Sequence, residues 1–303
     1  MKVLLAEYAV SIGMGGTFLL EGEAMLKTLA ESFTRLGHDV IYTSNGTVLK
    51  YGTPVQSNED NFEAVLEVEA KKCDAGLVIA PDELLFDLAT IIEENTINLG
   101  CSPESSALCA DKVKSTEKLL SAGIPAPRIV DKPDGGRYVV KPISGCASED
   151  TRLCSDFVQE EGFIATEYIV GEHLSVSLVC GDHVLPLAVN KQKIDFNPEK
   201  EESPIEYNGC LTPYRTPYQQ ELYETAIAVA KTLGCHGYIG VDIVLGTRPY
   251  VVDVNPRPTT SMFGICKVMK EEIGELLLKS CFGGLPESVE INGMCMFTKE
   301  DLQ

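Results

Sequence analysis

The sequence predicts a mixed α/β protein in which a small parallel sheet comes first and antiparallel strands follow. Segments typical of strands and helices alternate over the first hundred residues, as they do where helical crossovers join parallel strands. Beyond Asp111 the strand-like segments follow one another at hairpin spacing, which favours antiparallel pairing. The 303 residues are enough to bury the cores of two or three subdomains.

The elements of the first part follow from the positions of the apolar residues. Strands are expected at 2–6, 39–42, 75–80 and 96–99, and helices at 23–36, 62–72 and 83–94. A glycine-rich turn at 13–16 separates the first strand from the first helix. It does not complete a dinucleotide-binding G-x-G-x-x-G motif, because the position of the third glycine holds Phe18.

The later elements begin with a helix at 111–122, which Gly123 is expected to end. Helices are also expected at 219–233 and 268–279, and strands at 137–142, 163–168, 173–179, 184–189, 237–245 and 250–255. The segment 191–216 is rich in polar residues, proline and glycine, and is interpreted as a long loop that contacts substrate or moves as a flap. These elements suggest three subdomains, at 1–105, 106–170 and 171–303.

The composition is that of a globular protein, with 44% hydrophobic and 23% charged residues. A net charge of −20 argues against nucleic acid or an anionic membrane as a partner, and no apolar stretch has the length of a membrane span. Eleven cysteines without a Cys-x-x-Cys pair, and only four histidines, do not predict a zinc or iron–sulfur site. The first residues are expected to form a buried strand and not a secretion signal, so reduced thiols in the cytoplasm are expected.

One segment near the C-terminus carries the clearest chemical signal. Asp253 and Asn255 stand two residues apart, so they share one face of a strand, and Arg257 follows them. A hairpin turn at 246–249 can bring Asp242 opposite the end of this strand. Oxygen ligands beside a guanidinium suit Mg²⁺ or Mn²⁺ that carries a phosphate. The alternative is an ordinary half-buried strand that ends in a turn.

Two lysines are candidates for binding phosphate. Lys141 ends a Val-Val strand, and a loop of small residues at 144–148, which includes Ser144 and Gly145, follows it. Such a loop can close its backbone N–H groups over an anion that the lysine contacts. Lys112 stands at the start of a helix, where the helix dipole disfavours a cation, so an anionic neighbour is expected. The alternative for Lys141 is a lysine whose head lies in solvent.

A strand that ends at Glu167, Tyr168 and Ile169 enters a glycine turn at Gly171. A hinge of this kind offers backbone N–H and C=O groups to the edge of an adenine ring, while the tyrosine and isoleucine supply apolar walls. The same pattern occurs in many strands that enter a turn.

The order of these motifs resembles the ATP-grasp superfamily, and the likeness covers nearly the whole chain. The motifs are Asp-Lys before a helix and Gly-Ile-Pro-x-Pro, Val-Val-Lys-Pro, Glu-Tyr-Ile-x-Gly and Asp-x-Asn-Pro-Arg, at 111–112, 123–127, 139–142, 167–171 and 253–257. The resemblance implies an ATP-grasp fold. In that fold an N-terminal parallel α/β domain, the pre-ATP-grasp domain, precedes two α+β subdomains that clamp ATP.

The resemblance also implies a role for each motif. Lys112 and Lys141 would hold the α- and β-phosphates, with Lys141 and Arg257 acting in catalysis on the transferring phosphoryl group. The small-residue loop, with Ser144 and Gly145, would contact the same phosphates. The adenine site would be made by Glu167, Tyr168 and Ile169, and two ions, Mg²⁺ or Mn²⁺, would be held by Asp242, Asp253 and Asn255.

The chain departs from the family pattern at two positions. Family members often carry a glutamate for the ribose two residues after the hinge glycine, and here that position is His173, with Glu172 before it. Either residue can serve. The last metal-bridging residue is more often glutamate, so Asp253 is one methylene shorter but keeps the charge.

Other fragments resemble the archaeal tyramine–glutamate ligases of methanofuran biosynthesis. They are Glu7-Tyr8-Ala9-Val10-Ser11, Leu20 to Leu26, Ile79 to Glu83, His173 to Ser177, Asn190 to Gln192 and Tyr207 to Pro213. This resemblance implies an ATP-dependent ligase that joins the γ-carboxylate of L-glutamate to tyramine through an acyl phosphate, with release of ADP and phosphate.

Polar residues near the strands and the metal motif are candidates for substrate contacts, namely Asn190, Gln192, Thr259, Thr260 and Ser261. Glu23 is a candidate contact for a cationic amine. The partners expected are small molecules, and a homo-oligomer is compatible with the sequence. Three alternatives stay open: an ATP-grasp ligase for other amino acids, such as the lysine-joining type, an ATP-grasp phosphotransferase, and a nucleotide-sensing module without catalysis.

Overall fold

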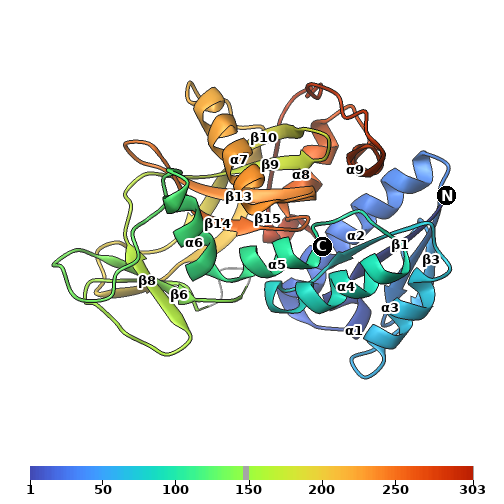
Figure 1. The fold of residues 1–303 in the computed structure, drawn as a ribbon, viewed down its shortest axis with the longest axis horizontal. Coiled ribbons are helices and arrows are strands. Elements are labelled where there is room, and N and C mark those ends of the chain that lie inside the picture. Colours follow the sequence, from blue (N-terminus) through green and yellow to red (C-terminus); the bar gives the residue numbers. More distant parts are fainter. Residues whose placement is uncertain (146–149, 303) are drawn as a thin grey trace.

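The computed structural model describes residues 1–145 and 150–302, and in this part of the chain the strands form three sheets (Figure 1). A five-stranded parallel sheet comes first in the sequence, and a four-stranded antiparallel sheet lies at the other end of the molecule. A six-stranded antiparallel sheet lies between them. The predicted α/β class, with the parallel sheet first, is confirmed. Within these residues no helix is long and apolar enough to cross a bilayer.

The parallel sheet has helices on both faces, which explains why its strands are almost wholly apolar. Its strand order is β3-β2-β1-β4-β5, with bounds Thr53–Gln56, Asp39–Ser44, Lys2–Glu7, Ala75–Ile79 and Ile97–Asn98. One face is covered by α3 (Phe62–Ala70) and α4 (Leu85–Asn95), which a short 3-10 helix, η1 (Asp82–Leu84), precedes. The other face is covered by α2 (Gly16–Arg35).

Two helices follow β1 where the sequence predicts a turn and one later helix. Glu7 caps α1 (Tyr8–Ile12), because its Oε2 accepts the N–H of Val10 at 2.8 Å. Gly13 ends α1 in the left-handed region at φ 78°. Helix α2 then begins at Gly16, well before residue 23. The glycines at 13–16, from which the sequence predicts a turn, stand at helix termini, where glycine is tolerated.

The four-stranded sheet has the order β11-β7-β6-β8, with bounds Glu202–Pro204, Arg152–Cys154, Tyr138–Pro142 and Phe163–Glu167. Helices α5 (Pro103–Ala110) and α6 (Lys112–Ser121) precede it in the chain. Of these two helices only α6 was predicted. Strand β11 comes from the predicted third subdomain but pairs with β7 of the second. The subdomain boundaries at 105 and 170 stay a prediction.

The six-stranded sheet has the order β14-β13-β9-β10-β12-β15, with bounds Pro249–Asn255, Gly237–Leu245, Glu172–Cys180, Val184–Asp195, Glu206–Thr212 and Cys295–Thr298. One face packs against α7 (Gln219–Leu233). The other packs against α8 (Ser261–Val268) and α9 (Ile273–Phe282). A 3-10 helix, η2 (Lys299–Leu302), follows β15. The predicted helix at 268–279 therefore corresponds to α9, with α8 as a separate helix before it.

The segment 191–216 is not the long loop that its composition predicts. Strand β10 continues to Asp195, and β11 and β12 follow, so much of the segment is paired. The pairing of β10 with β12 shifts register between Gln192 and Ile194. Backbone hydrogen bonds along the ladder, and not a run of apolar side chains, hold these partly exposed strands, so their composition is that of a loop.

One buried core joins the parallel sheet to the six-stranded sheet. It contains side chains of β1, β2 and β4, of α2, α8 and α9, and of the strands that face them. Helix α2 packs closely on α9, since a Cβ atom on Gly274 would lie 2.9 Å from the ring of Phe33. The Gly274 N–H donates to Ser32 Oγ at 3.0 Å. This core holds the carboxyl ends of β1 and β4 beside the hairpin of β13 and β14.

Gly237, at the start of β13, tests how tightly this junction is packed. Its φ is +64°, and a Cβ atom there would lie 2.3 Å from the carbonyl oxygen of Leu99. We expect Gly237→Ala to lower the free energy of unfolding by about 3 kcal/mol, since left-handed strain and a backbone clash add. Gly123→Ala, at φ +77° in open space, should cost about 1 kcal/mol from strain alone. Urea denaturation measures both, and equal losses would contradict the close packing.

Candidate active site

A cavity of about 260 Å³ lies where the three sheets meet. Its walls come from the carboxyl ends of β1 and β4, from α2, from β6, and from β9, β10, β13 and β14. Ligands of open α/β sheets bind beyond the carboxyl ends of parallel strands, so the first wall is in the expected place. The other walls carry most of the charged residues that the sequence predicts.

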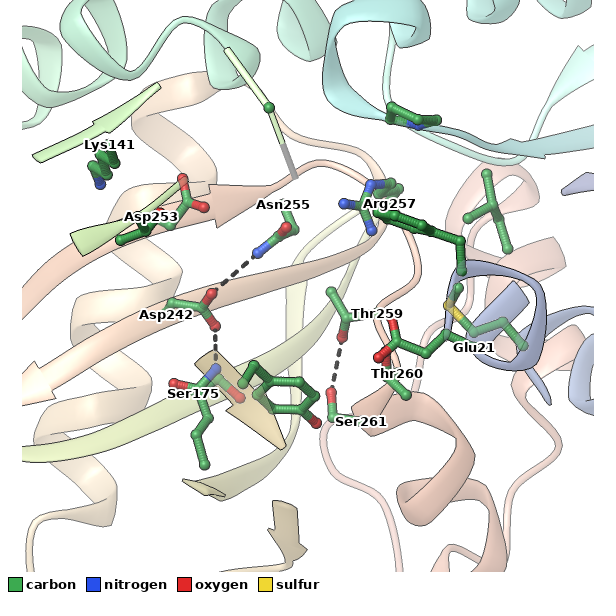
Figure 2. Close-up of a pocket in the computed structure, with 18 of the residues that line it drawn as sticks. Glu21, Lys141, Ser175, Asp242, Asp253, Asn255, Arg257, Thr259, Thr260 and Ser261 are labelled. Carbon is green, nitrogen blue, oxygen red and sulfur yellow. Dashed lines mark hydrogen bonds between the residues drawn. The ribbon is translucent and has the colours of Figure 1, made fainter. Parts of the chain in front are cut away.

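The hairpin of β13 and β14 brings together the three predicted metal ligands. Asp242 is paired with Asp253 in the ladder, and the register shifts directly after this pair. Asn255 Nδ2 lies 3.3 Å from Asp242 Oδ2 (Figure 2), and Gln192 Nε2 donates to Asp242 Oδ1 at 2.9 Å. Two carboxylates and an amide therefore face one region of the cavity.

The electrostatics of this pair fit a divalent cation. Burial, and after it the Asp253 carboxylate, raise the pKa of Asp242 to about 7, while hydrogen bonds from Asn255 and Gln192 lower it. Holding both carboxylates ionised is unfavourable without a nearby positive charge. Oxygen donors from carboxylate and amide groups are those that a hard cation prefers. The oxygen atoms of Asp242, Asp253 and Asn255, together with the repulsion between the two carboxylates, thus suit a metal ion.

Two nearly buried lysines lie beside the acidic pair. Lys112 Nζ donates to the carbonyl of Gly145 at 2.8 Å and lies 3.9 Å from Asp253 Oδ1. Lys141 Nζ donates to the carbonyl of Val252, and burial lowers the pKa of this lysine. Neither lysine extends into solvent, which was the alternative for Lys141. The expected anionic neighbour of Lys112 is Asp253.

The predicted phosphate loop is only partly described. Gly145 lines the cavity, whereas Ser144 does not, and residues 146–148 of the loop lie outside the described part of the chain. Gly145 has φ +145°, which favours glycine, and its carbonyl already holds Lys112. The described end of the loop therefore reaches the lysines.

Arg257 lies in the cavity wall next to the metal motif. Its Nε donates to Asp82 Oδ1 at 3.2 Å, and Asp82 is buried. Burial raises the pKa of Asp82, and the guanidinium lowers it. An ion pair between the segment after β14 and η1 thus fixes the guanidinium from the parallel-sheet side. The sequence does not predict this partner.

The predicted hinge is not part of the wall of this cavity. Glu167, Tyr168 and Ile169 do not line it; Glu167 Oε1 accepts the N–H of Arg128 at 3.0 Å. Of the two ribose candidates, His173 lines the cavity and Glu172 instead pairs with Lys191 at 2.8 Å. The adenine and ribose roles stay predictions.

Most predicted substrate contacts do line the cavity, namely Gln192, Thr259, Thr260 and Ser261. Thr259 and Ser261 share a hydrogen bond of 2.8 Å between their hydroxyl oxygens (Figure 2). Asn190 is fully buried and is not part of the wall; its Nδ2 donates to Ser175 and Ser177.

Further charged groups in the wall are not among the residues predicted from the sequence. Glu7 and Glu21 enter from the N-terminal part, and Lys299 enters from η2. Glu7 could have been suspected, because it stands at the carboxyl end of a buried parallel strand. Glu23, predicted to meet an amine, does not line the cavity and accepts a hydrogen bond from Thr47 at 2.6 Å.

Residues 109–261 match the family model of the ATP-grasp domain, which is half of the chain. The chain belongs to the ATP-grasp family. ATP-grasp enzymes use ATP and divalent metal ions, and the acidic pair and buried lysines of this cavity suit both. As an ATP-grasp ligase it is an enzyme that acts on small molecules.

Two curated relatives are similar to this ATP-grasp chain over nearly its full length. The tyramine–L-glutamate ligase of Methanocaldococcus fervens is 29% identical, over 92% of this chain and 93% of the relative. The tyramine–L-glutamate ligase of Methanocaldococcus jannaschii is 28% identical, over 92% and 88%. Among solved structures, an ATP-grasp superfamily protein from Archaeoglobus fulgidus has a TM-score of 0.79 at 28% identity, over 95% of this chain and 90% of that one.

The raised pKa of Glu7 predicts how the stability of the protein depends on pH. Burial raises this pKa to about 7 from 4.5; Glu21 adds to the rise, while Val10 and Arg257 oppose it. The folded protein then holds the proton more tightly than the unfolded chain does. The free energy of unfolding should fall as the pH rises from about 4.5 to about 7, and this contribution should be constant above. Thermal melting over this pH range checks the prediction: the melting temperature should fall less with rising pH in the Glu7→Gln variant than in the parent. An equal fall in both proteins would contradict it.

Proposed function

We propose that the protein is an ATP-dependent carboxylate–amine ligase that joins the γ-carboxylate of L-glutamate to tyramine, in methanofuran biosynthesis. The observation that carries this proposal is the cavity itself, where Asp242 and Asp253 face Lys112 and Lys141. The curated relatives, which match over nearly the whole chain, support the choice of substrates.

The reaction would proceed in two steps. The γ-carboxylate attacks the γ-phosphate of ATP, ADP departs, and an acyl phosphate forms. The amine then attacks the activated carbonyl carbon and expels phosphate. Neither step needs a covalent nucleophile on the enzyme, so catalysis depends on positioning and on preorganised charge.

The lysines, Arg257 and the three predicted metal ligands each have a task in this scheme. Lys112 and Lys141 hold the phosphates, and their burial among the walls keeps water from screening the contact. Arg257, which Asp82 fixes, faces the transferring phosphoryl group. Asp242, Asp253 and Asn255 would hold the divalent cations, Mg²⁺ or Mn²⁺. When bound, such cations neutralise phosphate charge and orient the transferring group.

A panel of substrates tests the proposal. The protein is incubated with ATP, Mg²⁺, L-glutamate and each of several amines, and ADP and amide products are measured by mass spectrometry. We expect ADP and γ-glutamyltyramine together. An amide formed with lysine and not with tyramine would favour a lysine-joining ligase. ADP with a stable phosphorylated product and no amine would favour a phosphotransferase, and ATP binding without turnover would favour a sensor.

Substitution of Arg257 is the most direct test of the phosphoryl-transfer step. We expect Arg257→Ala to lower kcat by about 10²–10³, the range for loss of one preorganised group that stabilises charge. Arg248→Ala is the matched control, because Arg248 is exposed at the hairpin turn and does not line the cavity. Thermal melting shows whether loss of the Asp82 partner unfolds the protein. A kcat within tenfold of the parent in a folded Arg257→Ala variant would exclude the role.

A further inference from the structure

The cavity has a second end, formed by the N-terminal part of the chain. Figure 2 shows Glu21 on one side of the view and Lys141 with Asp253 on the other, with Arg257 between them. Glu7 also lines this second end. Neither carboxylate has a task in phosphoryl transfer, and both lie far from the acidic pair in sequence.

The two carboxylates belong to one packed unit. Glu7 Oε2 accepts the N–H of Val10, which fixes the carboxylate at the start of α1. A Cβ atom on Gly22 would lie 2.2 Å from Glu7 Oε2, so the backbone of α2 touches this carboxylate. Glu21 directly precedes Gly22 in the chain, and its negative charge adds to the rise in the pKa of Glu7.

The charges at this end leave a place for an added cation. Glu21 pairs with Lys299 at 3.5 Å, and Arg257 pairs with the buried Asp82 at 3.2 Å. Glu7 is 5% exposed and accepts hydrogen bonds from neutral backbone N–H groups, those of Val10 and Ala9; the charge of Arg257 opposes only part of the rise that burial causes in its pKa. A cationic ligand between Glu7 and Glu21 would relieve the cost of keeping both carboxylates ionised.

Apart from Lys299, which pairs with Glu21, much of this wall is apolar. The apolar side chains that line it come from α2 and the turn before it and from the end of β4 and the residues after it, namely Met14, Phe18, Met25, Ile79, Ala80 and Pro81. An apolar wall with two carboxylates suits a primary ammonium group on a carbon arm better than it suits a polyphosphate or a dicarboxylate.

We propose that this end of the cavity is the subsite for the acceptor amine, in which Glu21 binds the substrate ammonium, Glu7 accepts its proton, and the apolar side chains hold its carbon arm. This inference rests on the proposed ligase function. It names Glu7 and Glu21 as residues that act in the second step only.

Amide formation removes two protons from the ammonium nitrogen. The ammonium gives one proton to the Glu7 carboxylate, and the freed nitrogen lone pair attacks the carbonyl carbon of the acyl phosphate. The C–N bond forms, the bond from that carbon to the phosphate oxygen breaks, and its electron pair leaves with the phosphate. The second proton lost from nitrogen goes to the departing phosphate. A base whose pKa is about 7 in the folded protein is suited to this transfer near neutral pH.

Hydroxylamine separates the two steps. It is small and uncharged near neutral pH, so it traps the acyl phosphate as a hydroxamate without an ammonium site. We expect Glu21→Gln to raise the KM for tyramine about tenfold or more, the equivalent of one charged hydrogen bond. The KM values for ATP and glutamate, and the hydroxamate rate, should stay at the parent level. Glu7→Gln should lower the kcat with tyramine about tenfold or more, again with hydroxamate formation retained.

Glu23→Gln is the matched control, since Glu23 stands on the same helix but binds Thr47 outside the cavity. It should keep the parent's rates with both nucleophiles. Glutamine at position 7 keeps an oxygen that can accept the Val10 N–H, so the cap of α1 is retained, and thermal melting verifies the fold of each variant.

The parent protein supplies a measurement that needs no variant. Phenethylamine and 2-phenylethanol share one carbon arm, and only the amine carries a positive charge. We expect the amine to compete with tyramine at least tenfold more tightly than the alcohol. Equal competition would overturn the proposal, as would a parallel loss of amide and hydroxamate in both variants. A parent that forms neither product would overturn the proposed function first and the subsite with it.

Discussion

The antiparallel pairing of β13 with β14 is the constraint on which the site depends. It sets Asp242 opposite Asp253, and a shift of one residue would turn every side chain of one strand to the other face. Buried side chains on both strands, such as Val241 and Val254, prevent that shift. The register therefore holds two carboxylates together although they repel. Lys112, at 3.9 Å from Asp253, offsets part of the repulsion, and a divalent cation would offset more.

The site also depends on the core that joins the parallel sheet to the six-stranded sheet. Without it the cavity would have only the walls that carry the acidic pair and the lysines. Packing of α2 against α9 brings the ends of β1 and β4 to the hairpin. The ion pair between Arg257 and Asp82 then joins the two sides at the cavity itself. Burial of both partners makes this contact depend on the whole junction, because neither charge has full access to solvent.

Charge is distributed unevenly in this acidic protein. The net charge is −20, but Lys112, Lys141 and Arg257 all line one cavity. At the other end of that cavity Glu7 and Glu21 provide negative charge among apolar side chains. Under the proposed function, one end suits a polyphosphate and the other suits an ammonium group. Opposite ends of one small cavity would then bring the activated carbonyl and the amine together.

The sequence by itself determined the fold class and the residues of the hairpin, because strands, turns and the spacing of Asp253 and Asn255 are local patterns. It did not predict β12 and β15, which pair with each other although they lie far apart in the chain. Only the tertiary structure decided that Asp82 meets Arg257 and that Glu7 and Glu21 share the cavity. Those contacts join residues distant in the chain, and the packing of whole sheets and helices, which no local pattern records, sets them.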